Sequence, residues 1–94
     1  MTLTNKVILI SHRGNYKMPD KDKENNPLQI SYMLDKGWNV EVDVWHDSGK
    51  FYLGHDKPKY EIKTSFLKNN NLWCHAKNLS ALQHMLNHGV HCFW

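Results

Sequence analysis

Little in this sequence of 94 residues is typical of a secreted or membrane protein. Its two cysteines, Cys74 and Cys92, form no CxxC motif and are too few for a disulfide framework, so we expect both to be reduced thiols. No segment approaches the roughly 20 consecutive apolar residues that a membrane span needs. The N-terminal residues also lack the charge and apolar run of a signal peptide. These absences predict a cytoplasmic protein without a membrane span.

The chain also lacks a strong charge of one sign. Its net charge is +3, and acidic and basic residues are mixed through residues 17–24 (KMPDKDKE). A nucleic-acid-binding protein usually carries a stronger basic stripe, so we expect a solvated loop here and no nucleic-acid partner. Hydrophobic residues make up 40% of the chain and include four tryptophans, which is typical of a folded domain rather than of a disordered chain.

A short strand with a carboxylate face is the most informative segment. From Val40 to Trp45, apolar and acidic residues alternate, and residues two apart on a strand point to the same side. The valines are therefore expected to face a core, while Glu41 and Asp43 lie together on the opposite face. Adjacent carboxylates repel each other, and a hard divalent cation held by their oxygens relieves that repulsion. The alternative is an ordinary solvated strand face.

Segments typical of strands and of helices follow one another along the chain. The expected strands cover residues 7–10, 39–45, 51–53 and 72–76, with a last strand from Val90. The expected helices cover residues 27–36, 61–68 and 79–88, the first and third with an asparagine N-cap and a glycine just beyond the end. Turn residues 47–49 predict that residues 51–53 return as a hairpin.

The order of these elements predicts where polar residues gather. Strands that alternate with helices pair in parallel through right-handed crossovers. In such sheets the chemistry lies at the carboxyl ends of the strands. His12, Asp43, His75 and Lys77 all come at or near the end of an expected strand. We therefore expect them to share one edge of the sheet.

Four short stretches carry a resemblance to a known family: His12-Arg13-Gly14, Glu24-Asn25-Asn26, Glu41-Val42-Asp43-Val44 and His55-Asp56. Their order and spacing resemble the N-terminal half of the glycerophosphodiester phosphodiesterase family, within the phospholipase C-like phosphodiesterase superfamily. The resemblance implies an α/β fold, the N-terminal half of a TIM (β/α)8 barrel, with about four parallel strands, three helices and a small hairpin after the second strand. Because a closed barrel takes about 200 residues or more, we expect residues 1–94 to be a single partial barrel domain, truncated at its C-terminus, that self-associates or needs a missing C-terminal half.

The same resemblance implies a metal-dependent hydrolase of lipid metabolism that cleaves glycerophosphodiesters or related lipid headgroup diesters. The implied roles are a divalent ion, Mg²⁺ or Ca²⁺, bound by Glu41 and Asp43, acid and base catalysis by His12 and His55, and phosphate binding by Arg13 and Lys77. Negative charge that builds on a reacting phosphodiester is stabilised by a metal and by the arginine fork. Histidine exchanges protons near neutral pH, as an acid or base must.

The third expected strand departs from the family pattern. The family usually has a carboxylate in a Glu-x-Lys pattern where this chain has His75-Ala76-Lys77. Imidazole favours softer ions than Mg²⁺ or Ca²⁺, so we expect His75 to line the site, together with Glu24 and Trp45, rather than to bind the metal. This departure and the missing half support the alternative of a catalytically inactive fragment, or of a binding or pseudoenzyme domain of the same fold.

Two further histidines, His84 and His88, stand four apart on the third expected helix. This spacing occurs in zinc proteases, but the pattern of those enzymes requires glutamate directly after the first histidine, and here Met85 follows it. We expect both to be surface histidines.

Overall fold

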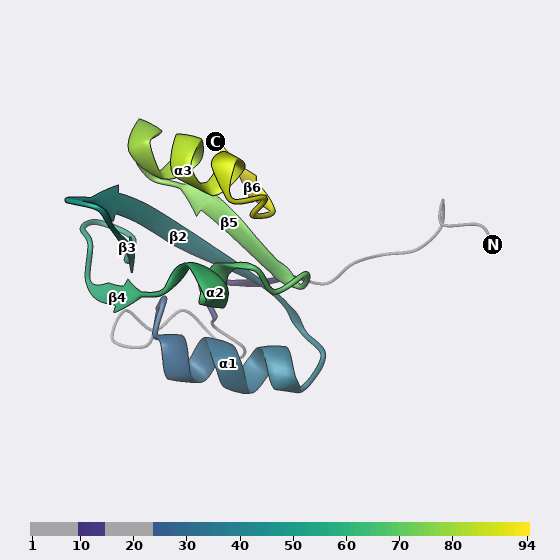
Figure 1. Cartoon of the computed structure of the whole chain (residues 1–94). Coiled ribbons are helices and arrows are strands. Elements are labelled where there is room, and N and C mark those ends of the chain that lie inside the picture. Colours follow the sequence, from purple (N-terminus) through teal and green to yellow (C-terminus); the bar gives the residue numbers. More distant parts are fainter. Residues whose placement is uncertain (1–9, 15–23) are drawn as a thin grey trace.

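A mixed β-sheet forms the centre of the structure, a computed structural model that describes residues 10–14 and 24–94. The strands are β1 (Ile10–His12), β2 (Asn39–Asp47), β3 (Lys50–Leu53), β4 (Tyr60–Ile62), β5 (Leu72–Ala76) and β6 (Cys92–Phe93). The helices are α1 (Pro27–Asp35), α2 (Thr64–Leu67) and α3 (Leu79–Asn87). Figure 1 shows β2 as the long strand through the middle, with α1 below it and α3 above it.

Strand β2 organises the sheet because it pairs along both edges. On one edge it is parallel to β5, with Asp43 opposite His75. On the other edge its first residues pair in parallel with β1, and its last residues pair antiparallel with β3. Strand β4 extends the sheet beyond β3, and β6 extends it beyond β5. Every other strand therefore takes its position, directly or through one neighbour, from β2.

The expected half of a TIM barrel, about four parallel strands with helices between them, is wrong. The described strands form one mixed sheet in the order β4-β3-β2-β5-β6, in which the β2–β3 and β3–β4 pairs are antiparallel. The hairpin between β2 and β3 was expected, so the difference comes from β4, which adds a third antiparallel strand where a helix was expected. Ser48 and Gly49 have positive φ values of 51° and 80°, as in the tight hairpin turns that reverse a strand. The chain then reverses a second time before β4, so two consecutive connections carry no helix.

The segment of residues 61–68 also differs from the expected helix. Its first part belongs to β4, and the helix α2 is a single turn from Thr64 to Leu67. Lys63 at the N-cap of α2 makes no side-chain capping bond, and a short helix without a cap has little stability of its own. The expected strand of residues 7–10 lies outside the described residues except for Ile10, at which β1 begins.

The starts of the other two helices confirm the sequence-based prediction. Asn26 caps α1 by accepting from the backbone N–H groups of Leu28 and Gln29, and Pro27 is the first helical residue. Asn78 caps α3 by accepting from the N–H of Ala81 at 2.9 Å. Asparagine favours this position because its side chain replaces a missing backbone acceptor.

One hydrophobic core lies between the helices and one face of the sheet. Val40, Val42 and Val44 of β2 are fully buried in it, together with residues from all three helices, for example Ile30, Leu67, Ala81 and Met85. The alternation of β2 therefore confirms that its valines face a core, and it leaves Glu41 and Asp43 on the opposite face. Among the described residues, no helix combines the length and apolar character needed to cross a membrane.

Candidate active site

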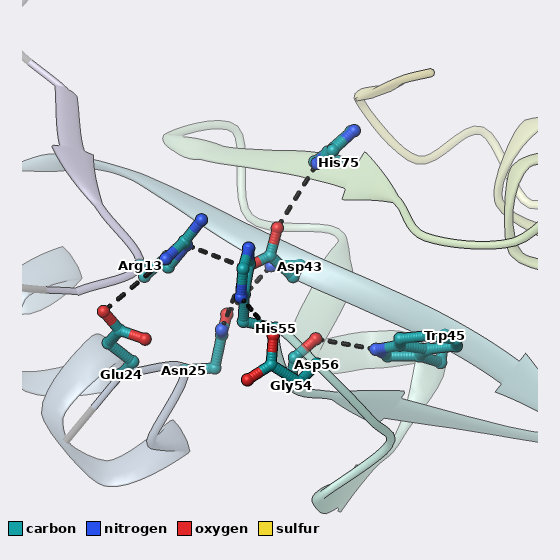
Figure 2. A network of polar contacts seen from close by, with 9 residues as sticks. All are labelled: Arg13, Glu24, Asn25, Asp43, Trp45, Gly54, His55, Asp56 and His75. Carbon is teal, nitrogen blue, oxygen red and sulfur yellow. Dashed lines mark hydrogen bonds and ion pairs between the residues drawn. The ribbon is translucent and has the colours of Figure 1, made fainter. Parts of the chain in front are cut away.

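A buried carboxylate, Asp43, is the centre of a polar network on the face of β2 opposite the valines (Figure 2). Asp43 is only 1% exposed. Its Oδ2 accepts a hydrogen bond from Asn25 Nδ2 at 3.1 Å and lies 3.1 Å from Arg13 Nε, while its Oδ1 lies 3.3 Å from His75 Nδ1. Burial disfavours a charged carboxylate unless such partners surround it. The network therefore keeps a negative charge inside the molecule.

Asn25 positions Asp43 from the turn that precedes α1. Its side chain is fully buried, and it makes two bonds to the same residue: Nδ2 donates to the Asp43 carboxylate, and Oδ1 accepts from the Asp43 N–H at 2.8 Å. The backbone of Asn25 has a φ of 60°, a left-handed conformation that asparagine tolerates better than most residues. Asn25 thus joins a loop and a strand that are 18 residues apart in the sequence.

Arg13 lies between two carboxylates. Its Nη1 is 3.5 Å from Glu24 Oε1, and its backbone oxygen accepts from the Asn25 N–H at 2.9 Å. The buried Nε is within ion-pair distance of Asp43 but makes no hydrogen bond, so this contact is electrostatic rather than directional. Asp43 and Glu24 together fix the guanidinium, and Arg13 also lines a pocket.

The pocket beside this network has a volume of about 370 Å³. It is lined by Arg13, Glu24, Gly54, His55, Asp56, Lys57 and Lys59. His55 Nδ1 lies 2.9 Å from Asp56 Oδ1, and the His55 side chain is 37% exposed. If Nδ1 carries the proton that binds Asp56, Nε2 is left to exchange a proton with a ligand.

The turn that carries His55 is fixed by two contacts from β2. Trp45 Nε1 donates to the Gly54 oxygen at 2.6 Å, and the Gly54 N–H donates to the backbone oxygen of Asp43 at 3.1 Å. Position 54 requires glycine because a Cβ atom there would lie 1.9 Å from the backbone oxygen of Lys57. The geometry of the turn therefore depends directly on the strand that carries Asp43.

Positive charge predominates at the wall of the pocket. Arg13, Lys57 and Lys59 are cationic, Glu24 and Asp56 are anionic, and His55 can take up a proton. A guanidinium that is already fixed offers its remaining donors to an anion with little loss of side-chain freedom. The pocket is therefore suited to a small anionic ligand such as a phosphate ester.

Several of the predicted site residues come together here. Arg13, Glu24, Asp43 and His75 are linked by ion pairs or hydrogen bonds. His55 lines the same pocket as Arg13 and Glu24, and Trp45 supports the turn beside it.

The remaining predicted residues are placed differently. Glu41 is half-buried and lies opposite Trp73 of β5. His12 is opposite Glu41 in the β1–β2 register, but its side chain lies outside the described part of the structure. Lys77 does not line the pocket, and its backbone N–H donates to the Val44 oxygen at 2.8 Å.

The described donors do not fit a ready-made divalent metal site. Asp43, one of the two expected ligands, is already engaged by Asn25, Arg13 and His75. A cation beside Asp43 would also meet the positive guanidinium of Arg13. Within residues 10–14 and 24–94, no group of three or more histidine, cysteine or acidic side chains is arranged to hold a metal ion. The described residues therefore support no catalytic step through a metal.

Three residues of this region were not predicted from the sequence to have a role. Asn25 belongs to the Glu24-Asn25-Asn26 stretch, but its contact with Asp43 depends on a left-handed turn that no sequence pattern indicates. Lys57 and Lys59 line the pocket as part of a Lys-Pro-Lys segment directly after His55-Asp56. That proximity was a usable signal, because side chains that follow a site residue within a turn remain near it.

Comparison with known proteins adds no relative to this description. Protein-family models, the curated proteins and the solved structures were each compared with the chain, and none of them matches it. The network around Asp43 and the pocket beside it are therefore the features that point to a function.

Proposed function

We propose that this protein hydrolyses phosphoric diesters, with glycerophosphodiesters or related lipid headgroup diesters as the substrate class. The main support for the proposal is that Arg13 and His55 line the same pocket. Arg13 is held by Glu24, and His55 is paired with the carboxylate of Asp56. The resemblance to the glycerophosphodiester phosphodiesterase family supports the same activity. A cytoplasmic setting is part of the proposal, since it would keep the unpaired thiols Cys74 and Cys92 reduced.

In the proposed reaction Arg13 binds two non-bridging oxygens of the phosphate, and Lys57 and Lys59 attract the anion to the pocket. A water molecule, or a substrate hydroxyl next to the phosphate, attacks phosphorus and forms a new P–O bond. The bond to the departing alkoxide breaks, and the His55 imidazolium gives this alkoxide its proton. The opposite proton transfer, from the nucleophile, is then the role of His12, the other histidine that the resemblance implies as acid or base. Asp56 holds the His55 ring in a fixed orientation.

The resemblance also implies Mg²⁺ or Ca²⁺ at Glu41 and Asp43, with Lys77 at the phosphate. A bound ion would supply positive charge to the reacting phosphate. To bind Asp43 in the arrangement described above, it would have to compete with Arg13 and His75. Metal dependence is thus a separate part of the proposal, tested by adding Mg²⁺ or Ca²⁺ and then a chelator.

The test is hydrolysis of a chromogenic phosphodiester, followed by glycerophosphodiesters, with the purified full chain. We expect His55→Asn to lower kcat by about 10²- to 10⁴-fold, because a general acid contributes roughly that much. His91→Gln is the matched control, since His91 packs on Trp73 and does not line the pocket. Equal turnover by the wild type and His55→Asn would contradict the proposal.

A binding domain without turnover is the second candidate, and one observation favours it. The Asp43 carboxylate is saturated by neighbouring side chains instead of being free for a ligand. In this case the pocket binds a phosphodiester but does not cleave it. Calorimetric binding of an uncleaved diester, weakened in Arg13→Gln, together with no turnover by the wild type, would establish this alternative.

A further inference from the structure

A second cluster of titratable side chains lies on the core-facing side of β2, away from the candidate active site. The ring of His46, a residue only 9% exposed, stacks on the ring of His84 in α3 with centroids 3.8 Å apart and planes at 17°. The ring of Phe51 in β3 meets His46 edge-on at 4.8 Å and lies 6.5 Å from the ring of His88. The proposed phosphodiester chemistry uses none of these residues.

The hydrogen bonds of Ser80 define the protonation of the stacked pair. The backbone oxygen of Ser80 can only accept, so His84 Nδ1, which lies 2.8 Å away, carries a proton. His46 Nδ1 lies 2.8 Å from the hydroxyl oxygen of Ser80. With one proton on each ring, the two neutral imidazoles can stack closely. A second proton on both rings would place two positive charges at the same short distance, where they repel.

His46 also holds the N-terminal end of α3 against the sheet. The side-chain oxygen of Asn78 accepts from the His46 N–H at 3.3 Å, and its nitrogen donates to the His46 backbone oxygen at 3.1 Å. Asn78 is also the N-cap of α3. Repulsion within the histidine stack therefore acts on the contact that holds α3 against β2.

The charged groups around His46 only partly offset this repulsion. Those that face it are Asp47 on β2, Lys50 on β3, Glu61 on β4, Lys63 before α2, and His84 and His88 on α3. Lys50 and Glu61 lie 3.8 Å apart and largely neutralise each other. Asp47 favours a charged His46, whereas His84 and His88 disfavour it. Burial of the ring acts in the same direction as the two histidines and is the largest effect.

We propose that the contact between His46 and His84 is a proton-sensitive attachment, which weakens the packing of α3 on the sheet when the solution becomes mildly acidic. The direction of the effect follows from linkage. Burial, and then His84, lower the pKa of His46 below 6.5, so the unfolded chain takes up this proton more readily than the folded chain. The stabilisation is complete above about pH 6.5 and is lost as the pH falls through the lowered value.

The test is urea unfolding of the full chain at about pH 7.5 and about pH 5.5. For the wild type we expect the unfolding equilibrium constant to rise several-fold as the pH falls from the first value to the second, because the pKa of His46 is lower in the folded chain than in the unfolded chain. In His84→Gln the rise should be smaller but still present, because the repulsion from the neighbouring imidazole is removed while burial still lowers the pKa of His46. His91→Gln, which removes a histidine outside the contact, should behave like the wild type. A pH dependence that is the same in all three proteins would overturn the proposal.

A measurement on the unmodified chain covers the case in which His84→Gln does not fold. Ring resonances of the seven histidines can be followed by NMR through the same pH range. We expect His46 to titrate below the ordinary histidine value of 6.5, and the backbone amides of residues 79–87 to shift with the His46 midpoint. Titration of His46 at the ordinary histidine value, with no change in α3, would refute the attachment.

Discussion

At the scale of single residues, Asn25 and Asp43 satisfy each other's hydrogen bonds in a place that water does not reach. Both residues are almost completely buried, and two bonds join them. A carboxylate in such a place is stable as a charge only while its donors stay in position. The amide of Asn25 provides one of these donors, and its oxygen also satisfies the N–H of Asp43.

Removal of the Asn25 side chain should therefore destabilise the fold. We expect Asn25→Gly, which keeps the left-handed backbone accessible, to lower the free energy of unfolding by about 2–4 kcal/mol because it leaves buried polar groups of Asp43 unpaired. Asn25→Ala should lose about 1 kcal/mol more, since alanine disfavours a φ of 60°. Urea unfolding would measure both values.

The exposed Asn70 provides the control for these variants. Asn70→Gly removes the same side chain at the surface and should change the unfolding free energy by less than about 1 kcal/mol. Similar losses in Asn25→Gly and Asn70→Gly would mean that the Asp43 contact contributes little to stability.

At the scale of the elements, the two asparagine caps differ in what they hold. Asn26 bonds only to the first turn of α1, through Leu28 and Gln29. Asn78 bonds to the first turn of α3 and also to both backbone groups of His46. A cap that also joins its helix to the sheet should contribute more than one that acts within the helix.

This difference can be measured with one substitution at each cap. We expect Asn26→Ala to lower the free energy of unfolding by about 1 kcal/mol, the usual contribution of an N-cap. Asn78→Ala should lower it by about 2–3 kcal/mol, because two further hydrogen bonds to β2 are lost. Thermal unfolding at neutral pH compares the two variants directly. Equal losses would show that the bonds between Asn78 and His46 add nothing to the cap.

Elements with a strong local signal were predictable from the sequence. The two capped helices and the hairpin after β2 depend on residues such as Asn26, Asn78 and Gly49, which act within a few positions of themselves. Strand β4 was missed because Ile62 and Phe66 fit a helical spacing as well as a strand next to a short helix. Pairing with β3 decides between the two, and that pairing is a tertiary contact.

At the scale of the whole molecule, the architecture could not be obtained by adding these elements together. Alternation of strands and helices favoured parallel pairing, and the family resemblance implied a half barrel, but the pairing of β4 with β3 extends the expected hairpin into an antiparallel edge of the sheet. The candidate site was predicted in part, because Arg13, Asp43 and His55 were chosen by residue type and position. Their supporting partner Asn25 was not, since only the folded chain brings it to β2.

Because Cys74 is buried, the reactivity of its thiol reports how often the whole fold opens. Cys74 is fully buried next to Cys92 of β6, and burial raises its pKa to about 12. A thiol reacts with iodoacetamide as the thiolate, so we expect Cys92 to be alkylated at least about tenfold faster than Cys74 in the native protein. In urea the two rates should converge. Mass spectrometry of the peptides would measure them, and equal native rates would contradict the burial of Cys74.

The raised pKa of the Cys74 thiol also predicts how the stability of the fold changes at alkaline pH. Because the folded pKa of Cys74 lies above its ordinary value of 9.0, the folded chain retains this proton more strongly than the unfolded chain does. Its contribution to stability is complete below about pH 9 and is lost as the pH rises toward 12.

The strict alternation of β2 limits how a chain of this kind can change in length. Deletion or insertion of one residue between Glu41 and His46 would exchange the two faces of the strand, sending the carboxylate into the apolar interior and a valine toward the solvent. The segment from His55 to Lys59 has no such constraint, because it runs outside the regular strands. Divergent descendants of this protein should therefore keep the spacing within β2 and gain or lose residues after His55, where each change reshapes one wall of the cavity and alters which ligands it admits.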